Sequence, residues 1–493
     1  MASIRTFVAC FLVAASAQAA PIGYEGARHL LNRTGFGATD GEIRDYAKLE
    51  RAQAVDRILA TARREAVVKP PAFVDGPFVR FVALQNLSEE DRRVEVRRRV
   101  DEASGIREWW LREMLTTPSP LTERMTLFWH GHFATSLQKV YSAKLMYQQN
   151  VLLRSESLGN FGALLHGIAR DPAMLVYLDA ARSQRQAPNE NFAREVMELF
   201  TLGEGNYSER DVKEAARAFT GWSLDREATF IRRPGQHDGG PKTVLGETGR
   251  FDGKDVLNIL LARPETAEFV TAKLWKEFVS PTPDRKEVKR LAAILRDGSY
   301  ELKPLMRAML ASDAFWAVDN RGTLVKSPVE LVVGTLRLFQ VQPMDLRPAA
   351  IACATLGQNP FAPPNVKGWP GGEAWINSAT LLNRKQVVER LVSNDDREGV
   401  APSGTGSKMR AAMASEGEMS GAAPAKGPQE QARRLMERGF ANYRVDWEKW
   451  PAARTDNLDN LVLAIAPANG VNAEITGIER VRRLTADPAY QLK

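Results

Sequence analysis

Cysteine is scarce in this sequence of 493 residues, which contains two, Cys10 and Cys353. This excludes a disulfide-stapled scaffold and a zinc site built from paired C-x-x-C motifs. Histidine is almost as rare, with five residues in the chain. No apolar run reaches the ~18 residues that a membrane-spanning helix needs, so we do not expect an integral membrane protein.

Several familiar catalytic signatures are also missing. The sequence has no G-x-S-x-G nucleophile elbow, no H-E-x-x-H zinc motif, no Walker A loop and no G-x-G-x-x-G after a strand. Cys353 lies in an alanine-rich helical pattern and is expected to be a buried apolar residue rather than a nucleophile. The common hydrolase, protease and nucleotide-binding motifs therefore give no assignment.

What is present is an ordinary globular composition, with 44% hydrophobic and 26% charged residues. A chain of this length can bury a large core without covalent staples. The formal net charge is +7. On a protein outside the cytoplasm, this mild positive charge suits anionic envelope polymers better than nucleic acid as partners. The densest basic run alternates with acidic residues, which is typical of a solvated helix face.

The first residues predict export. Arg5 precedes an apolar stretch, residues 7–15, and residues 17–19 form a small-x-small cleavage site. This pattern is typical of a secretory signal peptide, here residues 1–19, and it is too short for a membrane span. Cleavage would remove Cys10, and we expect a periplasmic or secreted protein.

Helix signals dominate the rest of the chain. Capping boxes begin at Thr39, Ser208 and Ser327, and the last of these combines with a proline at the first helical position. Strand signals are limited to a short hairpin over residues 242–251. We therefore predict a mainly α fold.

The expected organisation is one large helical domain, residues 20–394, followed by a disordered insertion, residues 395–428. The insertion is rich in Gly, Ala, Ser and Pro and has no period, so it lacks apolar surface to bury. Residues 429–493 are expected to pack back on the main domain, with helices over 431–450 and 473–484.

The densest polar cluster spans residues 189–201, where the 3.6-residue period predicts a helix with an apolar stripe. Asn191, Glu195 and Glu198 fall on the flank of that stripe, and Leu202 falls in the middle of the same flank. Part of the flank should therefore be covered. A covered carboxylate needs a cation, a metal or a proton, which favours a functional site, but a structural pair with an arginine is the equal alternative.

Two histidines, His130 and His132, stand two residues apart in an aromatic segment. On an extended strand both would face one way and could share a divalent metal ion. The preceding amphipathic pattern instead predicts a helix, on which they diverge by about 200°. His132 would then extend the buried face and His130 would not. Buried histidines among aromatic residues usually belong to the core, so both interpretations stay open.

One glycine-rich loop combines His237, Asp238 and Lys242, which are a base, an acid and a cation. Glycine lets a backbone approach a ligand closely, so the loop is a candidate binding site. The alternative is a plain turn before the predicted hairpin.

A second loop, residues 363–372, presents Lys367 and Trp369 between prolines and glycines. A tryptophan beside polar donors can stack on a sugar ring, although tryptophan more often fills a core.

Long segments of the sequence resemble the bacterial domain of unknown function 1800 family, and together they cover nearly the whole chain after residue 19. Only residues 395–428 fall outside the likeness. The segments that carry it are residues 28–37 (RHLLNRTGFG), 123–133 (ERMTLFWHGHF), 189–203 (NENFAREVMELFTLG), 216–222 (ARAFTGW), 326–328 (KSP), 363–369 (PPNVKGW) and 487–492 (DPAYQL).

The resemblance implies an exported, largely helical bacterial protein without an established activity. Members of the family are often encoded beside another exported family of sulfatase-like fold, which implies a shared pathway or complex. The family's recurrent polar positions match His130, His132, Asn189, Glu190, Asn191, Arg194, Glu195, Glu198, Trp222, His237 and Asp238 of this sequence.

We therefore expect an enzyme-like protein with one polar cleft that acts on an envelope or extracellular polymer by hydrolase-like general acid/base chemistry. Glu195 or Glu198 would be the acid/base, with His237 or His132 as proton partner. The expected ligand-binding residues are Asn191, Arg194, Trp222, Asp238, Lys242, Lys367 and Trp369.

The alternative is a non-catalytic binding or assembly partner of the neighbouring sulfatase-like protein. In that case the same polar residues would be structural pairs. A variant of the first hypothesis places a divalent metal ion on His130 and His132. Neither hypothesis involves nucleic acid.

Overall fold

The computed structural model describes residues 20–78, 84–392, 439–450 and 457–493. Helices dominate these residues, and their strands form two small antiparallel ribbons. The predicted mainly α fold is confirmed. The expected signal peptide, residues 1–19, and the expected disordered insertion, residues 395–428, lie outside the described residues.

The helices of the first part of the chain are α1 (Gly23–Thr34), α2 (Asp40–Ala47), α3 (Arg51–Ala60), η1 (Ala72–Val74), η2 (Leu84–Asn86), α4 (Glu89–Thr116), α5 (Pro120–His132), α6 (Leu137–Val140), α7 (Ala143–Ser155), α8 (Phe161–Ala169), α9 (Pro172–Tyr177) and η3 (Ala180–Arg182). The middle part contains α10 (Glu190–Glu195), the π-helical turn η4 (Val196–Thr201), α11 (Glu209–Ala218), β1 (Trp222–Leu224), β2 (Phe230–Arg232), η5 (Pro234–Gln236), β3 (Lys242–Val244), β4 (Glu247–Gly249), α12 (Gly253–Ala262), α13 (Pro264–Phe278), α14 (Arg285–Asp297), α15 (Leu302–Leu310) and α16 (Asp313–Trp316). The last part contains η6 (Val318–Asn320), α17 (Pro328–Leu338), α18 (Arg347–Thr355), η7 (Gly372–Trp375), α19 (Ser378–Val392), α22 (Leu458–Val462), α23 (Gly477–Ala486) and η9 (Pro488–Gln491).

The predicted helix starts are confirmed at the capping boxes. The side chains of Thr39, Ser208 and Ser327 each accept a hydrogen bond from the backbone three residues on, and the acidic side chain there bonds back. The predicted hairpin is present as β3 and β4, which pair from Lys242 with Gly249 to Val244 with Glu247. A second ribbon, β1 with β2, was not predicted.

The predicted helix over 431–450 is wrong for residues 441–450, which form turns and extended chain, whereas the described residues 439–440 are helical. Tertiary contacts replace the helical bonds there. The hydroxyl of Tyr443 donates to the carbonyl of Asp345 at 2.8 Å, and the indole of Trp450 donates to the carbonyl of Leu338 at 2.8 Å. These anchored aromatic residues fix the chain more strongly than its helical propensity does.

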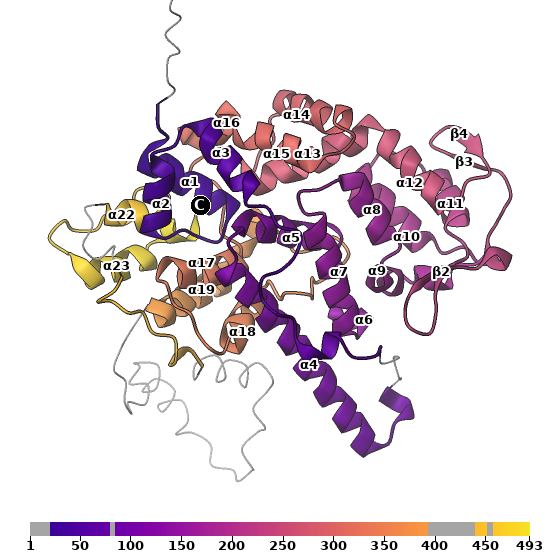
Figure 1. Ribbon diagram of the computed structural model, residues 1–493, viewed down its shortest axis with the longest axis horizontal. Coiled ribbons are helices and arrows are strands. Elements are labelled where there is room, and N and C mark those ends of the chain that lie inside the picture. Colours follow the sequence, from indigo (N-terminus) through magenta and orange to yellow (C-terminus); the bar gives the residue numbers. More distant parts are fainter. Residues whose placement is uncertain (1–19, 79–83, 393–438, 451–456) are drawn as a thin grey trace, which may run out of the picture.

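Segments far apart in the sequence lie side by side in Figure 1. The first helices, α1–α3, lie beside α22 and α23 from the other end of the chain, and α12–α15 form the upper edge. Arg28 of α1 donates to the carbonyls of Asn460 and Ala464, both at 2.8 Å. The backbone of Lys326 donates to Gln491 at 2.8 Å. The two ends of the described chain are therefore part of one packed unit.

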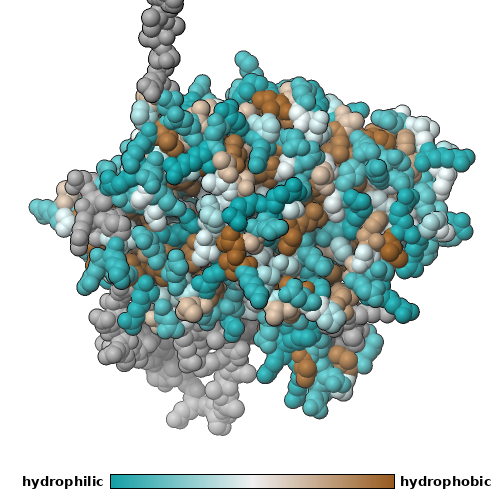
Figure 2. Space-filling view, in the orientation of Figure 1, coloured by the Kyte–Doolittle hydropathy of each residue, from teal (hydrophilic) through white to brown (hydrophobic). Residues whose placement is uncertain are grey.

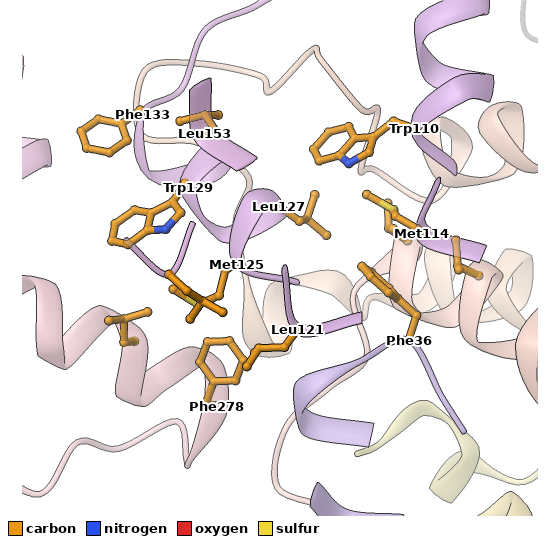
Figure 3. Packing of buried hydrophobic residues seen from close by; sticks show 14 of the residues in the cluster. Phe36, Trp110, Met114, Leu121, Met125, Leu127, Trp129, Phe133, Leu153 and Phe278 are labelled. Atoms are coloured by element: carbon orange, nitrogen blue, oxygen red, sulfur yellow. The ribbon is translucent and has the colours of Figure 1, made fainter. Parts of the chain in front are cut away.

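Helix α5 runs through the middle of the core, with neighbours on several faces. Leu121, Met125, Leu127 and Trp129 are all buried, although they point in different directions around the helix. Figure 3 shows Trp129 pointing to the side of Phe133 and Leu127 pointing to the other side, toward Trp110. The charged residues Glu123 and Arg124 of this helix are buried as well, so α5 lies inside the protein and its charges need partners there.

A buried ion pair fixes α5 against α7. Arg154 donates to both oxygens of Glu123, at 2.6 and 2.9 Å, and the indole of Trp110 donates to the same carboxylate at 2.8 Å. Both charged side chains are 1% exposed. This ion pair fixes the position of α5 along its axis and its rotation about that axis. It therefore positions the end of α5, where the site described below lies.

On the face that Figure 2 shows, hydrophilic residues cover most of the surface and hydrophobic ones lie in small separate groups. Among the helices that the structure describes, none has both the length and the apolar composition to cross a bilayer.

Candidate functional site

His130 lies at the end of α5 and is fully buried, so the expectation that it leaves the buried face of the helix is wrong. The face of α5 that carries His130 is covered too, and the ring packs against Trp110, Phe361 and Trp369 at centroid distances of 5.3–5.5 Å. Neither ring nitrogen has a hydrogen-bond partner among the described residues. Burial lowers the pKa of His130 to about 3, so the imidazole is neutral.

His132 ends α5 and also sits among aromatic rings, but it borders a cavity. Its Nε2 is 3.1 Å from the carbonyl of Phe200, while Nδ1 has no partner in the described chain. Burial lowers the pKa of His132 well below its usual value, and the charge of Lys273 lowers it further. His132 is therefore a neutral imidazole with one free nitrogen.

The two imidazoles lie on a helix and face different neighbours, as the helical alternative predicts. Within the described parts of the chain, no group of three or more His, Cys, Asp or Glu side chains is arranged to hold a metal ion. Metal binding at His130 and His132 stays a prediction from the sequence.

The polar cluster of residues 189–201 begins as α10 and continues as the π-helical turn η4, not as the regular helix expected from its period. The backbone of Leu202 donates to Met197 at 2.8 Å, five residues back. This wider turn moves the residues after Val196 out of the 3.6-residue register. π-Helical turns often occur at functional sites, which makes this departure from the pattern informative.

Glu195 and Glu198 both lie at this turn and are partly buried. Burial raises the pKa of Glu195, the nearby Glu198 raises it further, and the charges of Arg194 and Lys367 oppose the rise. Glu198 accepts a hydrogen bond from the hydroxyl of Tyr207 at 2.5 Å. The pKa of Glu195 is therefore shifted in the direction that a general acid needs.

The neighbouring polar residues of this cluster form ion pairs and hydrogen bonds at the protein surface. Arg194 donates to both oxygens of Glu209, at 2.6 and 2.7 Å, and lies 3.5 Å from Glu190. Asn191 is exposed, and its backbone donates to the side chain of Asn189 at 2.8 Å. Neither Arg194 nor Asn191 borders the cavity that His132 lines.

The His237–Lys242 loop is tied down from inside. His237 Nδ1 lies 3.0 Å from the carbonyl of Thr220, and Arg217 donates to Asp238 at 2.7 Å. The ammonium of Lys242, which is buried, donates to the carbonyls of Asp238 and Gly240 at 2.5 and 3.0 Å.

Trp222 is buried nearby, in edge contact with Phe219 and Phe230. These four predicted site residues, His237, Asp238, Lys242 and Trp222, lie apart from the cavity beside His132. Their contacts fit a structural role in holding the loop against β1 and α11.

The loop with Lys367 and Trp369 lies directly against the end of α5. At Gly368, where φ is +85°, an added Cβ would lie 2.2 Å from the carbonyl oxygen of Gly131. Only glycine permits this approach. The approach brings Trp369 onto His130 and places both Lys367 and Trp369 in the wall of the cavity.

The cavity has a volume of about 390 Å³ and lies between the end of α5, helix α13, the start of α17 and the loop of residues 367–375. Its aromatic wall is made by Phe128, Trp369 and Trp375. Five cationic side chains line it, namely Arg124, Lys273, Lys276, Lys367 and Lys493, against two carboxylates, Glu277 and Glu330.

Both carboxylates are already neutralised by the wall itself. Arg124, which is buried, pairs with Glu277 and, at 2.8 Å, with Glu330. Lys493 pairs with Glu330 as well. Although burial raises the pKa of Glu330, the charges of Arg124 and Lys493 together hold it well below its usual range. Lys367 pairs with Glu204 at 3.5 Å, a residue outside the lining. The positive charge that remains on the wall therefore comes from Lys273 and Lys276.

Three of the predicted site residues thus meet at one cavity: His132, Lys367 and Trp369. His130 lies behind Trp369, and Glu195 is near enough to Lys367 to sense its charge. The lysines that α13 adds to the cavity wall were not predicted from the sequence. Lys273 and Lys276 stand one helical turn apart in a pattern that resembles any solvated face, so only the fold identifies them.

The fold and the site define a helical protein with a cationic, aromatic-walled cavity beside a π-helical turn. The chain belongs to the family described as "Protein of unknown function (DUF1800)", which matches residues 29–492, so the resemblance found in the sequence is confirmed. No curated protein and no solved structure matches this chain.

Proposed function

We propose that this protein is an exported enzyme that takes an anionic segment of an envelope or extracellular polymer into the cavity and hydrolyses it by general acid/base catalysis. The observation that carries the proposal is the surplus of positive charge in the wall. Lys273, Lys276 and Lys367 line the cavity together, whereas both carboxylates there are paired with Arg124. Such a cleft raises the local concentration of an anionic substrate.

The aromatic residues of the wall favour a sugar-like substrate. Trp369 and Trp375 lie on the same loop as Lys367, and Phe128 lies on α5. Flat aromatic faces stack on the apolar faces of rings while nearby cations hold carboxylate, sulfate or phosphate groups. An acidic polysaccharide combines these two features.

Glu195 is the proposed general acid/base. Its pKa is raised by burial and by Glu198, and Lys367 connects it with the cavity. Glu195 itself does not line the cavity, so the proposal requires a polymer that extends out of the cavity past Lys367. We assign His132 rather than His237 as the proton partner because His132 lines the cavity and His237 does not. Each imidazole has one nitrogen at a backbone carbonyl, His132 Nε2 at Phe200 and His237 Nδ1 at Thr220.

Export through residues 1–19 belongs to the same proposal, because the substrate class is one that occurs outside the cytoplasm. Cell fractionation with N-terminal sequencing of the mature protein tests it. A chain that starts at Ala20 in the periplasm or medium is expected, and a full-length chain in the cytoplasm would contradict the proposal.

The activity test uses the purified protein with a panel of acidic polysaccharides, measuring new reducing ends and binding separately. Glu195→Gln should lower hydrolysis by about 10²–10⁴-fold and leave binding intact. Lys276→Glu should weaken binding, with Lys289→Glu on α14 as a matched surface control. Hydrolysis that Glu195→Gln leaves unchanged would refute the catalytic role, and binding that Lys276→Glu leaves unchanged would refute the site.

The alternative, a non-catalytic assembly partner of an exported sulfatase-like protein, draws support from a separate observation. Arg194, Asp238 and Lys242 are all engaged by internal partners, as expected of structural residues. Co-purification from periplasm, with and without the sulfatase-like protein, tests this alternative. A stable complex together with no polymer binding would favour it over the enzyme.

A further inference from the structure

One lysine in the cavity is placed unlike the others. Lys273 lies on α13, lines the cavity and remains only partly exposed. Its ammonium is 5.3 Å from the centre of the Phe269 ring. Among the residues that the structure describes, no carboxylate forms an ion pair with it. Glu277, one turn further along the same helix, is turned to Arg124 instead.

The groups that face Lys273 disfavour its charged form. Burial and the like charge of Lys276 lower the pKa of Lys273 to about 8 from an ordinary 10.5. His132 faces it from α5 and is itself neutral, so it supplies no negative charge. A desolvated lysine beside a second cation is the arrangement that makes an amine nucleophilic near neutral pH.

We propose that Lys273 is a reactive amine that forms an imine with an anionic aldehyde or α-keto acid held in the cavity. The open-chain reducing end of an acidic sugar belongs to this class. The inference rests on the proposed function because it uses the same cavity, and it deepens that function by naming the reactive group of the substrate.

The step balances without an oxidant or a reductant. The lone pair of the Lys273 nitrogen adds to the carbonyl carbon, and the π electrons of the C=O bond move to oxygen, which takes up a proton. The carbinolamine then loses that oxygen as water while the nitrogen loses its second proton, which leaves C=N. His132 Nδ1, which has no partner in the described chain, can take the proton from nitrogen and return it to oxygen.

The cavity also supplies the anion site that such a substrate needs. Lys276 stands at i+3 from Lys273 on the same helix, and Lys367 approaches from the opposite loop. Like charges one turn apart destabilise a helix unless an anion neutralises them. A carboxylate or phosphate between these lysines would fix a carbonyl beside the Lys273 amine.

Pyridoxal phosphate, an anionic aldehyde, is the probe. The full-length protein is incubated with it at pH 7, reduced with borohydride and mapped by peptide mass spectrometry. Lys273 should be labelled on the order of 100-fold faster than a lysine with the ordinary pKa of 10.5, from the difference in unprotonated fraction, and the exposed Lys289 is the residue against which the rate is compared. Lys273→Arg should abolish this label, and Lys289→Arg, the matched control, should not change it.

A second variant tests the electrostatic cause. Lys276→Gln removes both the like charge and part of the anion site, so it should shift the pH profile of Lys273 labelling upward and lower its rate at pH 7. In the unmodified protein the profile should have its midpoint near pH 8. This measurement needs no variant, so it holds even if Lys273→Arg does not fold.

Two results would overturn the inference: equal labelling of Lys273 and Lys289, or a labelling midpoint near that of an ordinary lysine. Either can occur while polymer hydrolysis still depends on Glu195, in which case the proposed function stands and the amine chemistry fails. If Lys273 is labelled selectively but hydrolysis does not depend on Glu195, the amine chemistry stands and the proposed acid/base function fails.

Discussion

The contact between Gly368 and Gly131 gives the sharpest prediction, because it joins the two elements that build the cavity wall. An added Cβ at Gly368 would lie 2.2 Å from the carbonyl oxygen of Gly131 and 3.1 Å from its carbon. These atoms belong to the backbone of α5, which the core holds on several faces. They cannot rotate away, so the loop itself has to move.

The magnitude of Gly368→Ala follows from two terms. A left-handed φ of +85° costs a non-glycine residue about 1–2 kcal/mol. Overpacking against a rigid neighbour adds about 1–3 kcal/mol. We therefore expect the free energy of unfolding to fall by about 2–5 kcal/mol. The displaced loop should carry Trp369 off the His130 ring and Lys367 out of the wall.

Gly131→Ala is the matched control at the other side of the same contact. Its Cβ would meet the Trp369 ring at 3.6 Å, which is ordinary van der Waals distance. Because the substitution lies inside the last turn of α5, it should leave stability unchanged or raise it by up to about 1 kcal/mol.

Urea unfolding followed by tryptophan fluorescence measures the free energy of unfolding of both variants. Binding of an acidic polysaccharide shows whether the cavity wall is intact. Gly368→Ala should lose stability and binding together. The reasoning would be refuted if Gly368→Ala unfolded like the unmodified protein, or if Gly131→Ala were the more damaging of the two.

Three further predictions concern groups around the site. Glu123→Gln leaves Arg154 charged and buried, so urea unfolding should show a loss of about 3–5 kcal/mol, and adding Arg154→Met should restore part of it. Because the folded pKa of His130 is lowered to about 3, the unfolded chain binds a proton between pH 3 and 6.5 that the folded chain does not. Stability should thus rise with pH across this window, and His130→Leu should reduce the slope by up to about 1.4 kcal/mol per pH unit; an unchanged slope would show that His130 titrates normally. Lys242→Met removes the donor to the carbonyls of Asp238 and Gly240, so limited proteolysis should cut this loop faster while polymer binding is unchanged; lost binding would place the loop in the site.

Local signals predict much of the fold because they are physically local. Thr39, Ser208 and Ser327 each satisfy backbone donors at a helix start with a side chain three residues away, so the sequence contains the whole interaction. The 441–450 segment fails for the opposite reason. Its geometry depends on partners about 100 residues away, and no local pattern records them.

The candidate site divides in the same way. His132, Lys367 and Trp369 stand in segments whose composition is unusual, and the fold brings them together. The burial of His130 could not be predicted, because the side chains that enclose it come from Trp110, Phe361 and Trp369. Periodicity describes one face of a helix, whereas α5 packs against neighbours on several faces and borders the cavity with another.

The state of the hydrogen bonds and ion pairs separates structural from available polar groups. Arg194, Asp238 and Lys242 have their donors or acceptors filled by the protein, so a ligand would have to displace those contacts. Lys273 has no ion-pair partner and the buried Nδ1 of His132 has no hydrogen-bond partner among the described residues, and both residues line the cavity.

His130 shows that a missing hydrogen-bond partner does not by itself identify a ligand-binding residue. Both of its ring nitrogens are unpartnered in the described chain, yet aromatic rings enclose it and it does not line the cavity. Burial of these unpartnered nitrogens costs free energy, and they cannot contact a ligand in the cavity. His130 is therefore best described as a core residue that packs against Trp369. A free polar group is therefore informative where it also borders a space that a ligand can enter, and at this cavity Lys273 and His132 meet both conditions.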